Sequence, residues 1–345
     1  MDLSVVIVNW NTREELRACV ASLREAAPGS RLSGPGNDSG SCPGAQPAGA
    51  LTESGERRAE SASEASIEVI VVDNASTDGS AAMVREAFPE VALIANAENR
   101  GYAAANNQGI ARARGEFVML LNPDTELPRE APGQLIDFLR AHPQAGAVAP
   151  RLVHPDGRIQ ESVRGWPTPG ALMEEAVGPR IAFCVVRHEE RLQPSRQSAR
   201  RDTKYSSSYR VPVAVLTEPV PVPQPMTSCL VIRRQALEEV GVMDERFPIF
   251  FNDVDLCFRL WEAGHEIWYL PAVRVLHHGG ASTRQVRPRM IRESHRSLCA
   301  FYAKHYRRRL PLPVYAATVA AVRAVGAVRW AAARMRERKA QHAGH

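Results

Sequence analysis

The sequence predicts an α/β protein with a mostly parallel sheet flanked by helices. Three runs rich in apolar residues, at residues 3–8, 67–72 and 117–121, are too short for helices and are typical of strands buried on both faces. Amphipathic helical patterns lie between these runs, and such alternation favours parallel strands joined by helices. With 345 residues, 44% of them hydrophobic, the chain is long enough to bury a large core.

A helix is predicted directly after the first strand. Thr12 and Glu15 have the spacing of a capping box, in which each side chain bonds a free backbone N–H of the first turn. Leu16, Val20 and Leu23 then recur on one face, which predicts that this face packs on the sheet.

The composition changes at residues 28–66, where Gly, Ser, Pro, Ala and Glu dominate and few side chains are available for a core. We predict a disordered insertion there. The alternation then resumes. Its elements are strand 67–72, a helix carrying Val84 and Phe88, strand 91–95, helix 102–113 and strand 117–121.

The second half of the chain is less regular. Residues 179–225 are rich in Arg, Ser and Pro, which predicts an irregular or mobile segment over the cleft. Later elements are strand 229–232, a helix at 254–263 that ends at Gly264, and strands 267–270 and 273–276. We expect residues 1–285 to form one α/β domain.

Residues 286–345 are expected to form a basic helical C-terminal extension. Its stretch 311–333 is apolar apart from Arg323 and Arg329, and two arginines at mid-bilayer are costly. We therefore expect these helices to make peripheral contact with a membrane surface. Packing of the helix on the α/β domain, or a membrane crossing, remain the alternatives.

The overall charge and the cysteines set broad limits on partners and location. A formal net charge of +5 fits a polyanionic substrate or an anionic membrane surface and does not require nucleic acid, so no nucleic-acid partner is expected. The six cysteines have no metal-ligand or redox spacing and indicate a reducing compartment. The first residues lack the basic region of a signal peptide. We expect a cytoplasmic protein at the inner face of the cell membrane.

Polar residues follow two predicted strands, at the sheet edge where ligands of parallel sheets bind. Asp73 ends strand 67–72, where its carboxylate can accept hydrogen bonds from ribose or a pyrimidine N–H, or cap the next helix. Ser76 and Asp78 are better caps, which leaves Asp73 for a ligand. Asp124 follows strand 117–121 and can bind Mg or Mn, although Asn122-Pro123-Asp124 is also typical of a type I turn.

Further candidates lie at a helix start and near the end of the α/β domain. Asn99, Arg100 and Gly101 open helix 102–113, where phosphate can bind, or Asn99 caps the helix. Inside that helix, Asn106 and Asn107 are poor helix formers.

Asp253 and Asp255 open helix 254–263, either as a general base or as partners of the helix dipole. His277 and His278 follow a strand, where one imidazole can join Asp124 at a metal or contact a diphosphate, or both face solvent.

Taken together, these segments resemble the family 2 glycosyltransferases with the GT-A fold, particularly the bacterial rhamnosyltransferase-like branch. They follow the family's order across about residues 3–305. The stretches that carry the resemblance are SVVIVNWN at 4–11, VVDNASTDGS at 71–80, NRGYAAANN at 99–107, LNPD at 121–124, DERF at 244–247, NDVDLC at 252–257 and VLHHGGAST at 275–283.

The resemblance implies roles for individual residues. Asp124 matches the metal-binding aspartate of the family's Asp-x-Asp motif, Asp253 its catalytic base, and His277 its late metal or diphosphate ligand. Residues implied in binding the nucleotide-sugar are Asn9, Asn11, Asp73, Asn99, Arg100, Gly101, Asn106 and Asn122.

Three positions depart from the family's pattern. Asn122 replaces the first aspartate of the metal motif, which leaves less negative charge for a cation. Asn252 stands where a glutamate usually precedes the base. Thr227-Ser228 occupies a position usually held by Gly-Ala beside the acceptor.

The resemblance implies an inverting, divalent-cation-dependent transfer, with dTDP-rhamnose as donor. The acceptor would be a hydroxyl of a lipid-linked or polysaccharide sugar in cell-envelope glycan synthesis. A sugar nucleotidyltransferase would need a Gly-rich basic loop after the first strand, and Asn9-Trp10-Asn11-Thr12 is not one. A noncatalytic nucleotide-sugar-binding or scaffold member of the same fold is the alternative left by Asn122 and Asn252.

Overall fold

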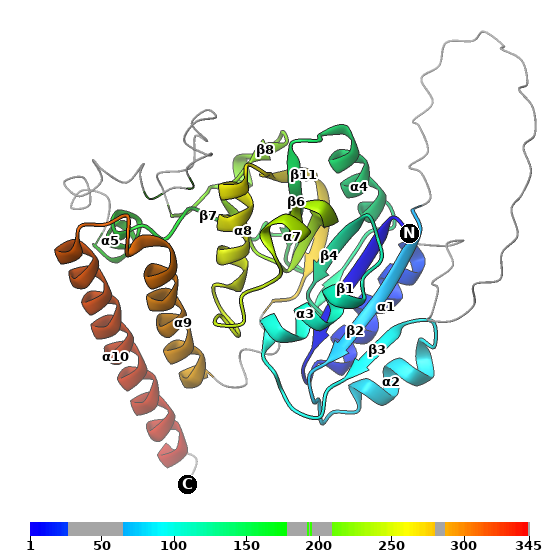
Figure 1. Cartoon of the computed structure of the whole chain (residues 1–345). Coiled ribbons are helices and arrows are strands. Elements are labelled where there is room, and N and C mark those ends of the chain that lie inside the picture. Colours follow the sequence, from blue (N-terminus) through cyan, green and yellow to red (C-terminus); the bar gives the residue numbers. More distant parts are fainter. Residues whose placement is uncertain (27–64, 178–191, 193, 195–208, 280–286, 344–345) are drawn as a thin grey trace, which may run out of the picture.

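The fold, in a computed structural model, is a mixed and mostly parallel sheet with helices on both faces (Figure 1), as the sequence predicts. The structure describes residues 1–26, 65–177, 192, 194, 209–279 and 287–343. The nine-stranded sheet of this part of the chain has the order β3-β2-β1-β4-β10-β6-β11-β5, with β8 also paired to β11.

The first half of the sheet is parallel and confirms the predicted strands. Its members are β1 (Leu3–Asn9), β2 (Ile67–Asp73), β3 (Ala92–Ala95) and β4 (Phe117–Leu121). Every residue of β1, β2 and β4 is buried. In β1, Val5 and Ile7 face one core cluster and Val6 faces the other, because successive side chains of a strand point to opposite faces. Both faces of this half are therefore covered.

The second half of the sheet mixes directions. Strand β10 (Cys229–Arg233) runs antiparallel between β4 and β6 (Ala145–Val153). Strand β11 (Glu266–His277) runs parallel to β6, with a shift of register between Leu270 and Arg274. The two strands predicted at 267–270 and 273–276 are therefore one strand with an irregularity. Two short strands, β5 (Thr125–Glu126) and β8 (Val220–Pro221), complete this sheet. Strands β7 (Val163–Arg164) and β9 (Gln224–Pro225) pair with each other in a separate two-stranded sheet.

Helices cover the two faces of the sheet, and each face has its own hydrophobic core. Helices α1 (Arg13–Ala26), α2 (Ser80–Ala87) and α4 (Ala131–Ala141) pack in one core. Helices α3 (Tyr102–Arg112), α7 (Arg234–Val240) and α8 (Asn252–Ala263) pack in the other. Gly109 brings α3 against β1, since a Cβ there would lie 2.3 Å from a methyl carbon of Val6. Two shorter elements of the described residues are helix α5 (Pro169–Val177) and the 3-10 turn η2 (Val213–Val215).

The predicted capping box at the start of α1 takes a different form. The Thr12 hydroxyl donates to Oδ1 of Asn9 (2.7 Å), and Asp78 accepts the backbone N–H of Arg13 (2.9 Å). The helix start is thereby tied to the loops after β1 and β2, because both of its partners lie there.

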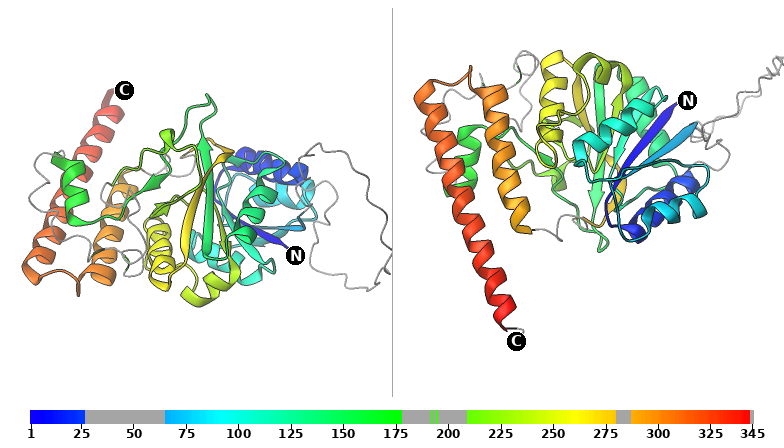
Figure 2. Two further views of the ribbon diagram at one scale, coloured as in Figure 1. Left: turned by 90° about the horizontal axis from the view of Figure 1, so that it is seen from above. Right: turned by 60° about the horizontal axis from the view of Figure 1, so that its bottom comes forward.

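The C-terminal segment consists of α9 (Arg287–Phe301), a π-helix η4 (Tyr302–Tyr306) and α10 (Leu312–Ala343). Figure 2 shows α9 and α10 side by side, with α8 between them and the sheet. Phe301, Tyr302 and Tyr306 are buried in the same core as α8. The end of α9 and η4 therefore share a core with the sheet, whereas α10 contacts mainly α9 and η4.

Helix α10 is the one helix in the described ranges that is long and apolar enough to cross a membrane, over Leu312–Arg336, with 11% of its apolar window buried. Of the segment predicted to be irregular, the described residues 209–225 bury Val211, Val213 and Val222 in the core. The predicted insertion at 28–66 lies outside the described residues, apart from Ala65 and Ser66. Cys19, Cys229 and Cys257 are free and buried.

Candidate active site

The pairing of β1 with β2 places Asn9 beside Asp73. Asn9 donates from Nδ2 to Oδ1 of Asp73 (3.0 Å), and the backbone N–H of Ser76 donates to Oδ2 (3.0 Å). Both carboxylate oxygens of Asp73 thus have partners within the protein. Of the two predicted caps, Asp78 bonds the start of the next helix, since its Oδ1 accepts the backbone N–H of Ser80 (3.0 Å), but Asp73 also closes the turn and so is less free for a ligand than the sequence predicts.

Asn11 joins the same two loops. Asn11 has a left-handed backbone conformation (φ 51°), and its backbone N–H donates to Oγ of Ser76 (3.0 Å). Its Oδ1 accepts the backbone N–H of Thr77 (2.8 Å). Asn9 and Asn11 therefore shape the end of the sheet where the predicted nucleotide residues gather.

Asn74 organises the segment 99–101 and was not identified from the sequence. Its buried carboxamide donates from Nδ2 to Oδ1 of Asn99 (3.0 Å) and accepts the backbone N–H of Arg100 at Oδ1 (3.0 Å). The signal available in the sequence is its place directly after Asp73 at a strand end. Asn74 holds the segment so that the Arg100 side chain is exposed.

The first backbone N–H groups of α3, where a phosphate site was predicted, are bonded within the protein. The backbone N–H groups of Tyr102 and Ala103 donate to the carbonyl oxygen of Pro248 (2.6 and 3.2 Å). Gly101 has φ 86°, and a Cβ there would lie 3.1 Å from Pro248, so this close contact requires glycine. These two N–H groups are engaged within the protein, which leaves Arg100 as the candidate phosphate ligand of this turn.

The two asparagines of α3 have different surroundings. Asn107 exchanges hydrogen bonds with the backbone of Met243 (2.9 and 3.0 Å) and ties α3 to the loop before α8. Asn106 donates to the carbonyl of Tyr102 (2.9 Å), but its buried Oδ1 has no hydrogen-bond partner in the described part of the chain. An unsatisfied buried acceptor is costly, which keeps Asn106 a ligand candidate.

Asn122 and Tyr102 are hydrogen-bonded to each other, and Tyr102 is influenced by the charges of both acidic candidates, Asp124 and Asp253. Asn122 accepts the Tyr102 hydroxyl at Oδ1 (3.2 Å) and donates to Oγ of Ser228 (3.1 Å). Burial raises the pKa of Tyr102 to about 12, and the negative charges of Asp253 and Asp124 contribute in the same direction. Tyr102 therefore lies within electrostatic reach of both the proposed base and the proposed metal ligand.

Asp124 and His277 meet because β5 pairs with the end of β11. Nε2 of His277 lies 3.3 Å from Oδ1 of Asp124, and this buried nitrogen makes no hydrogen bond in the described part of the chain. His278 instead points to Glu126 (2.9 Å) and is exposed. Of the two histidines, His277 is the one that faces Asp124.

Gln160 fixes how the His277 ring is presented. Its Nε2 donates to the carbonyl oxygen of His277 (2.6 Å), so its Oε1 is the atom 2.8 Å from Nδ1 of the ring. Because Oε1 only accepts, Nδ1 carries the proton and a neutral ring keeps a lone pair on Nε2. That lone pair and a carboxylate oxygen are ligands suited to Mg or Mn.

The Asp124–His277 pair fits a divalent cation that takes its other ligands from substrate or water. No third His, Cys, Asp or Glu joins the pair within the described residues. Mg²⁺ typically binds one or two protein carboxylates and completes its shell with phosphate oxygens and water.

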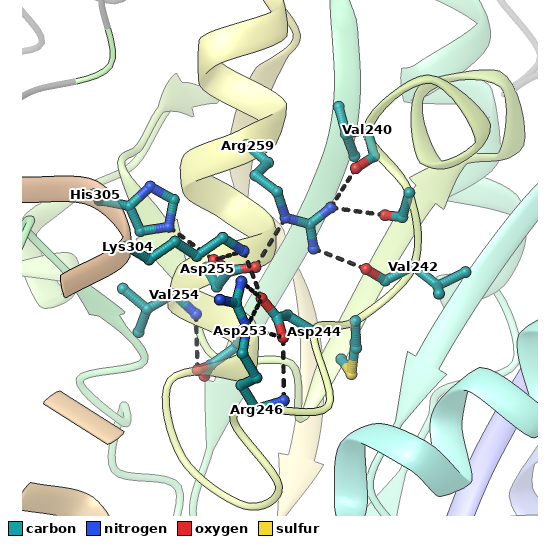
Figure 3. Close-up of polar contacts among 12 residues, drawn as sticks. Val240, Val242, Asp244, Arg246, Asp253, Val254, Asp255, Arg259, Lys304 and His305 are labelled. Carbon is teal, nitrogen blue, oxygen red and sulfur yellow. Dashed lines mark hydrogen bonds and ion pairs between the residues drawn. The ribbon is translucent and has the colours of Figure 1, made fainter. Parts of the chain in front are cut away.

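Asp253 and Asp255 differ sharply in their surroundings (Figure 3). Asp255 is fully buried and contacts Arg259 (2.8 Å), Lys304 (2.5 Å) and His305 (2.7 Å). Burial opposes its ionisation, but the hydrogen bond from His305 and the positive charges of Arg259 and Lys304 bring its pKa below the usual value. Asp253 accepts the backbone N–H of Val254 (2.8 Å), and burial raises its pKa. Of the two carboxylates, Asp253 is the one able to take a proton.

The residues before Asp253 explain one departure from the family's pattern. Asn252 donates from Nδ2 to the carbonyl oxygens of Phe247 (3.2 Å) and Ile249 (2.9 Å), which a glutamate carboxylate cannot do. Phe251 has φ 68°, a strained conformation for an aromatic residue. Asn252 therefore stabilises the sharp turn that presents Asp253.

Comparison with known proteins identifies the family. The sequence profile of glycosyl transferase family 2 matches residues 56–241. The N-acetylglucosaminyl-diphospho-decaprenol L-rhamnosyltransferase of Mycobacterium tuberculosis is 31% identical over 261 residues, which cover 71% of this chain and 77% of that protein. The low-salt glycan biosynthesis hexosyltransferase Agl10 of Haloferax volcanii is 23% identical over 61% of this chain and 58% of its own.

The crystal structure of GalNAc-T7 with UDP, GalNAc and Mn²⁺ matches the fold, with a TM-score of 0.50 and 16% sequence identity over 80% of this chain and 44% of that one. The chain belongs to glycosyl transferase family 2 and has the GT-A fold. It is a glycosyltransferase of cell-envelope glycan synthesis, which sets aside the noncatalytic alternative.

Replacing Gln160 tests the presentation of His277. We expect Gln160→Leu to weaken Mn²⁺ binding about 10- to 100-fold, because the ring loses the partner that fixes its tautomer and orientation. The measurement is a calorimetric titration of the full chain with Mn²⁺ in the presence of dTDP. Gln224→Leu is the control, since Gln224 is equally buried and bonds the carbonyl of Gly165. Wild-type affinity in Gln160→Leu would contradict this role.

Proposed function

We propose that the chain is an inverting rhamnosyltransferase that uses dTDP-rhamnose and a lipid-linked sugar acceptor. One observation carries the choice of substrates: the 31% identity to the mycobacterial L-rhamnosyltransferase, whose name specifies an N-acetylglucosaminyl-diphospho-lipid acceptor. The arrangement of acidic residues supports a single displacement, because it offers one candidate base and one candidate metal site.

The candidate base is Asp253. Its pKa is raised by burial, and its carboxylate accepts the backbone N–H of Val254. A carboxylate of raised pKa is a better proton acceptor. In the proposed reaction Asp253 takes the proton of the acceptor hydroxyl, the hydroxyl oxygen bonds the anomeric carbon, and the nucleoside diphosphate leaves with the electrons of the broken bond. The anomeric configuration inverts.

Asp124 and His277 are the residues that would hold Mg or Mn. A divalent cation bound there supplies Lewis-acid stabilisation of the negative charge on the leaving diphosphate. Among the chain's own residues, Gln160 orients His277, and Asn9, Asn11, Asp73 and Asn74 form the wall proposed to bind the nucleoside. The exposed Arg100 is proposed to meet the diphosphate, since a guanidinium matches two phosphate oxygens.

Substitution of the base separates chemistry from binding. We expect Asp253→Asn to lower kcat by about 10²- to 10⁴-fold, because the amide cannot take the acceptor proton. Nucleotide binding is expected to be retained, since the predicted nucleotide residues lie on other elements. Rhamnosyl transfer and dTDP binding are measured side by side. The matched control is Asp156→Asn, which removes a surface carboxylate paired with Arg158. Normal turnover in Asp253→Asn would refute the assignment.

We also propose that α10 binds the cytoplasmic face of the membrane that carries the acceptor. Gly326 packs closely on His295 of α9, and Arg292 and Arg334 lie over the ring of Trp330. Elsewhere the helix exposes large apolar side chains to solvent. They are Leu312, Val314, Val325, Val328 and Met335. An exposed apolar helix that also carries arginines has the character of an interfacial helix on anionic lipid.

Vesicle sedimentation tests this contact. The double variant Val325→Gln, Val328→Gln is expected to lower the affinity for phosphatidylglycerol vesicles about tenfold or more, because two apolar side chains no longer enter the interface. Val215→Gln is the control, since Val215 is 72% exposed and Val328 69%, but Val215 lies outside α10. If the double variant sediments like the wild type, α10 is not the contact.

A further inference from the structure

A π-helix places two side chains of the C-terminal segment against the helix that carries Asp253. In η4 the backbone N–H of Arg307 donates to the carbonyl of Tyr302 (2.9 Å), five residues earlier. Such turns are rare and are often found at functional sites. Tyr302 and Tyr306 are buried in the core, and between them Lys304 and His305 reach Asp255 (Figure 3).

Lys304 joins two carboxylates that lie on either side of Asp253 in the chain. Its Nζ is 2.7 Å from Oδ2 of Asp244 and 2.5 Å from Oδ1 of Asp255. The segment 244–255, which presents Asp253, is thus held at both ends by one ammonium group.

His305 supports the second of these contacts. Its Nε2 lies 2.7 Å from the same Oδ1 of Asp255, and an ionised carboxylate only accepts, so Nε2 carries the proton. The ring packs on Phe258 and Phe301, with centroids 4.4 and 4.7 Å away. Burial lowers the pKa of His305, so the ring is neutral at neutral pH. Its position is set by packing as well as by Asp255.

Arg259 anchors the other side of Asp255. It bonds Oδ2 of Asp255 and donates to the carbonyl oxygens of Val240 (2.5 Å), Gly241 (2.8 Å) and Val242 (2.8 Å). The loop before Asp253 is therefore fixed from within α8 by Arg259 and from η4 by Lys304.

The charges around the two carboxylates are distributed unequally. Asp255 faces Arg259, Lys304 and His305, and Arg246 pairs with Asp244 (2.6 Å). The negative charge of Asp253 helps to raise the pKa of Tyr102 in α3. The pKa of the Cys257 thiol is raised by burial and also by the charges of Asp253 and Asp255. Loss of Lys304 would leave negative charge on Asp244 and Asp255 less compensated, in the neighbourhood of Asp253.

We propose that Lys304 and His305 are positioning residues for sugar transfer, which hold Asp244 and Asp255 and thereby the segment that presents Asp253 to the acceptor. This inference rests on the proposed role of Asp253 as base. It assigns the C-terminal segment a part in the reaction that is separate from membrane contact, because the contacts come from η4 and not from α10.

The test compares Lys304→Gln, Lys304→Arg and Arg309→Gln in the full chain, with rhamnosyl transfer followed across pH. We expect Lys304→Gln to lower kcat by about tenfold or more with the donor KM unchanged, since the base is misplaced and the nucleotide wall is not. In the plot of kcat/KM against pH, the acid limb, where activity rises with pH, should move to higher pH. Asp253 must be ionised to act, and extra negative charge nearby raises its pKa. Lys304→Arg should restore both readouts.

Arg309→Gln is the control for loss of a positive charge on this side of α8, because Arg309 pairs with Glu262 (2.8 Å) and lies over the ring of Phe258. It should leave the acid limb in place. An unmoved acid limb in Lys304→Gln, or an equal shift in Arg309→Gln, would overturn the proposal. Should Lys304→Gln fail to fold, His305→Phe removes the second hydrogen-bond donor to Asp255 but keeps a ring, and a wild-type kcat with wild-type donor KM there would overturn the proposal.

Failure of this inference can be told apart from failure of the proposed function. If Asp253→Asn turns over normally, the base is wrong whatever the Lys304 variants do. If Asp253→Asn is inactive and Lys304→Gln retains the wild-type pH profile, the base stands and only the positioning role fails.

Discussion

The in-register pairing of β1 with β2 and β4 is the constraint on which the site depends. Asn9 lies opposite Asp73, and Ile7 lies opposite Leu121, so the loops that follow β1, β2 and β4 leave the same edge of the sheet. Because all three strands are buried on both faces, a slip of one residue would move apolar side chains out of their core. The hydrophobic cores therefore fix the positions of the polar loops, and β5 then carries Asp124 to His277 on β11.

Two carboxylates two residues apart are given opposite properties by their surroundings. Asp255 meets three nitrogen-bearing side chains and has a lowered pKa, while Asp253 is bonded by backbone N–H and has a raised pKa. The division follows from which side of α8 each residue occupies. Asp255 faces η4 and Asp253 lies at the turn after the strained Phe251. A structural role for one residue and a chemical role for the other can thus coexist in a single helical turn.

The sequence predicts the parts of the fold that depend on local pattern. Runs rich in apolar residues identify β1, β2 and β4, and polar residues at their ends identify the candidate site. Strand β6 was not predicted, because Gly146 and Pro150 interrupt its strand pattern. Contacts between distant segments have no local signature. Gln160 against His277, Lys304 against Asp255 and the Pro248 carbonyl at the start of α3 all depend on the three-dimensional arrangement.

Sugar transfer is proposed to proceed by a single displacement in which Asp253 takes the acceptor proton. The anomeric configuration of the product tests it most directly, because one displacement inverts the anomeric carbon and a covalent intermediate would retain it. Nuclear magnetic resonance of the rhamnosylated product, with dTDP-rhamnose as donor, distinguishes the two. We expect a product with the configuration opposite to that of the donor. A product that retains the donor's configuration would contradict it.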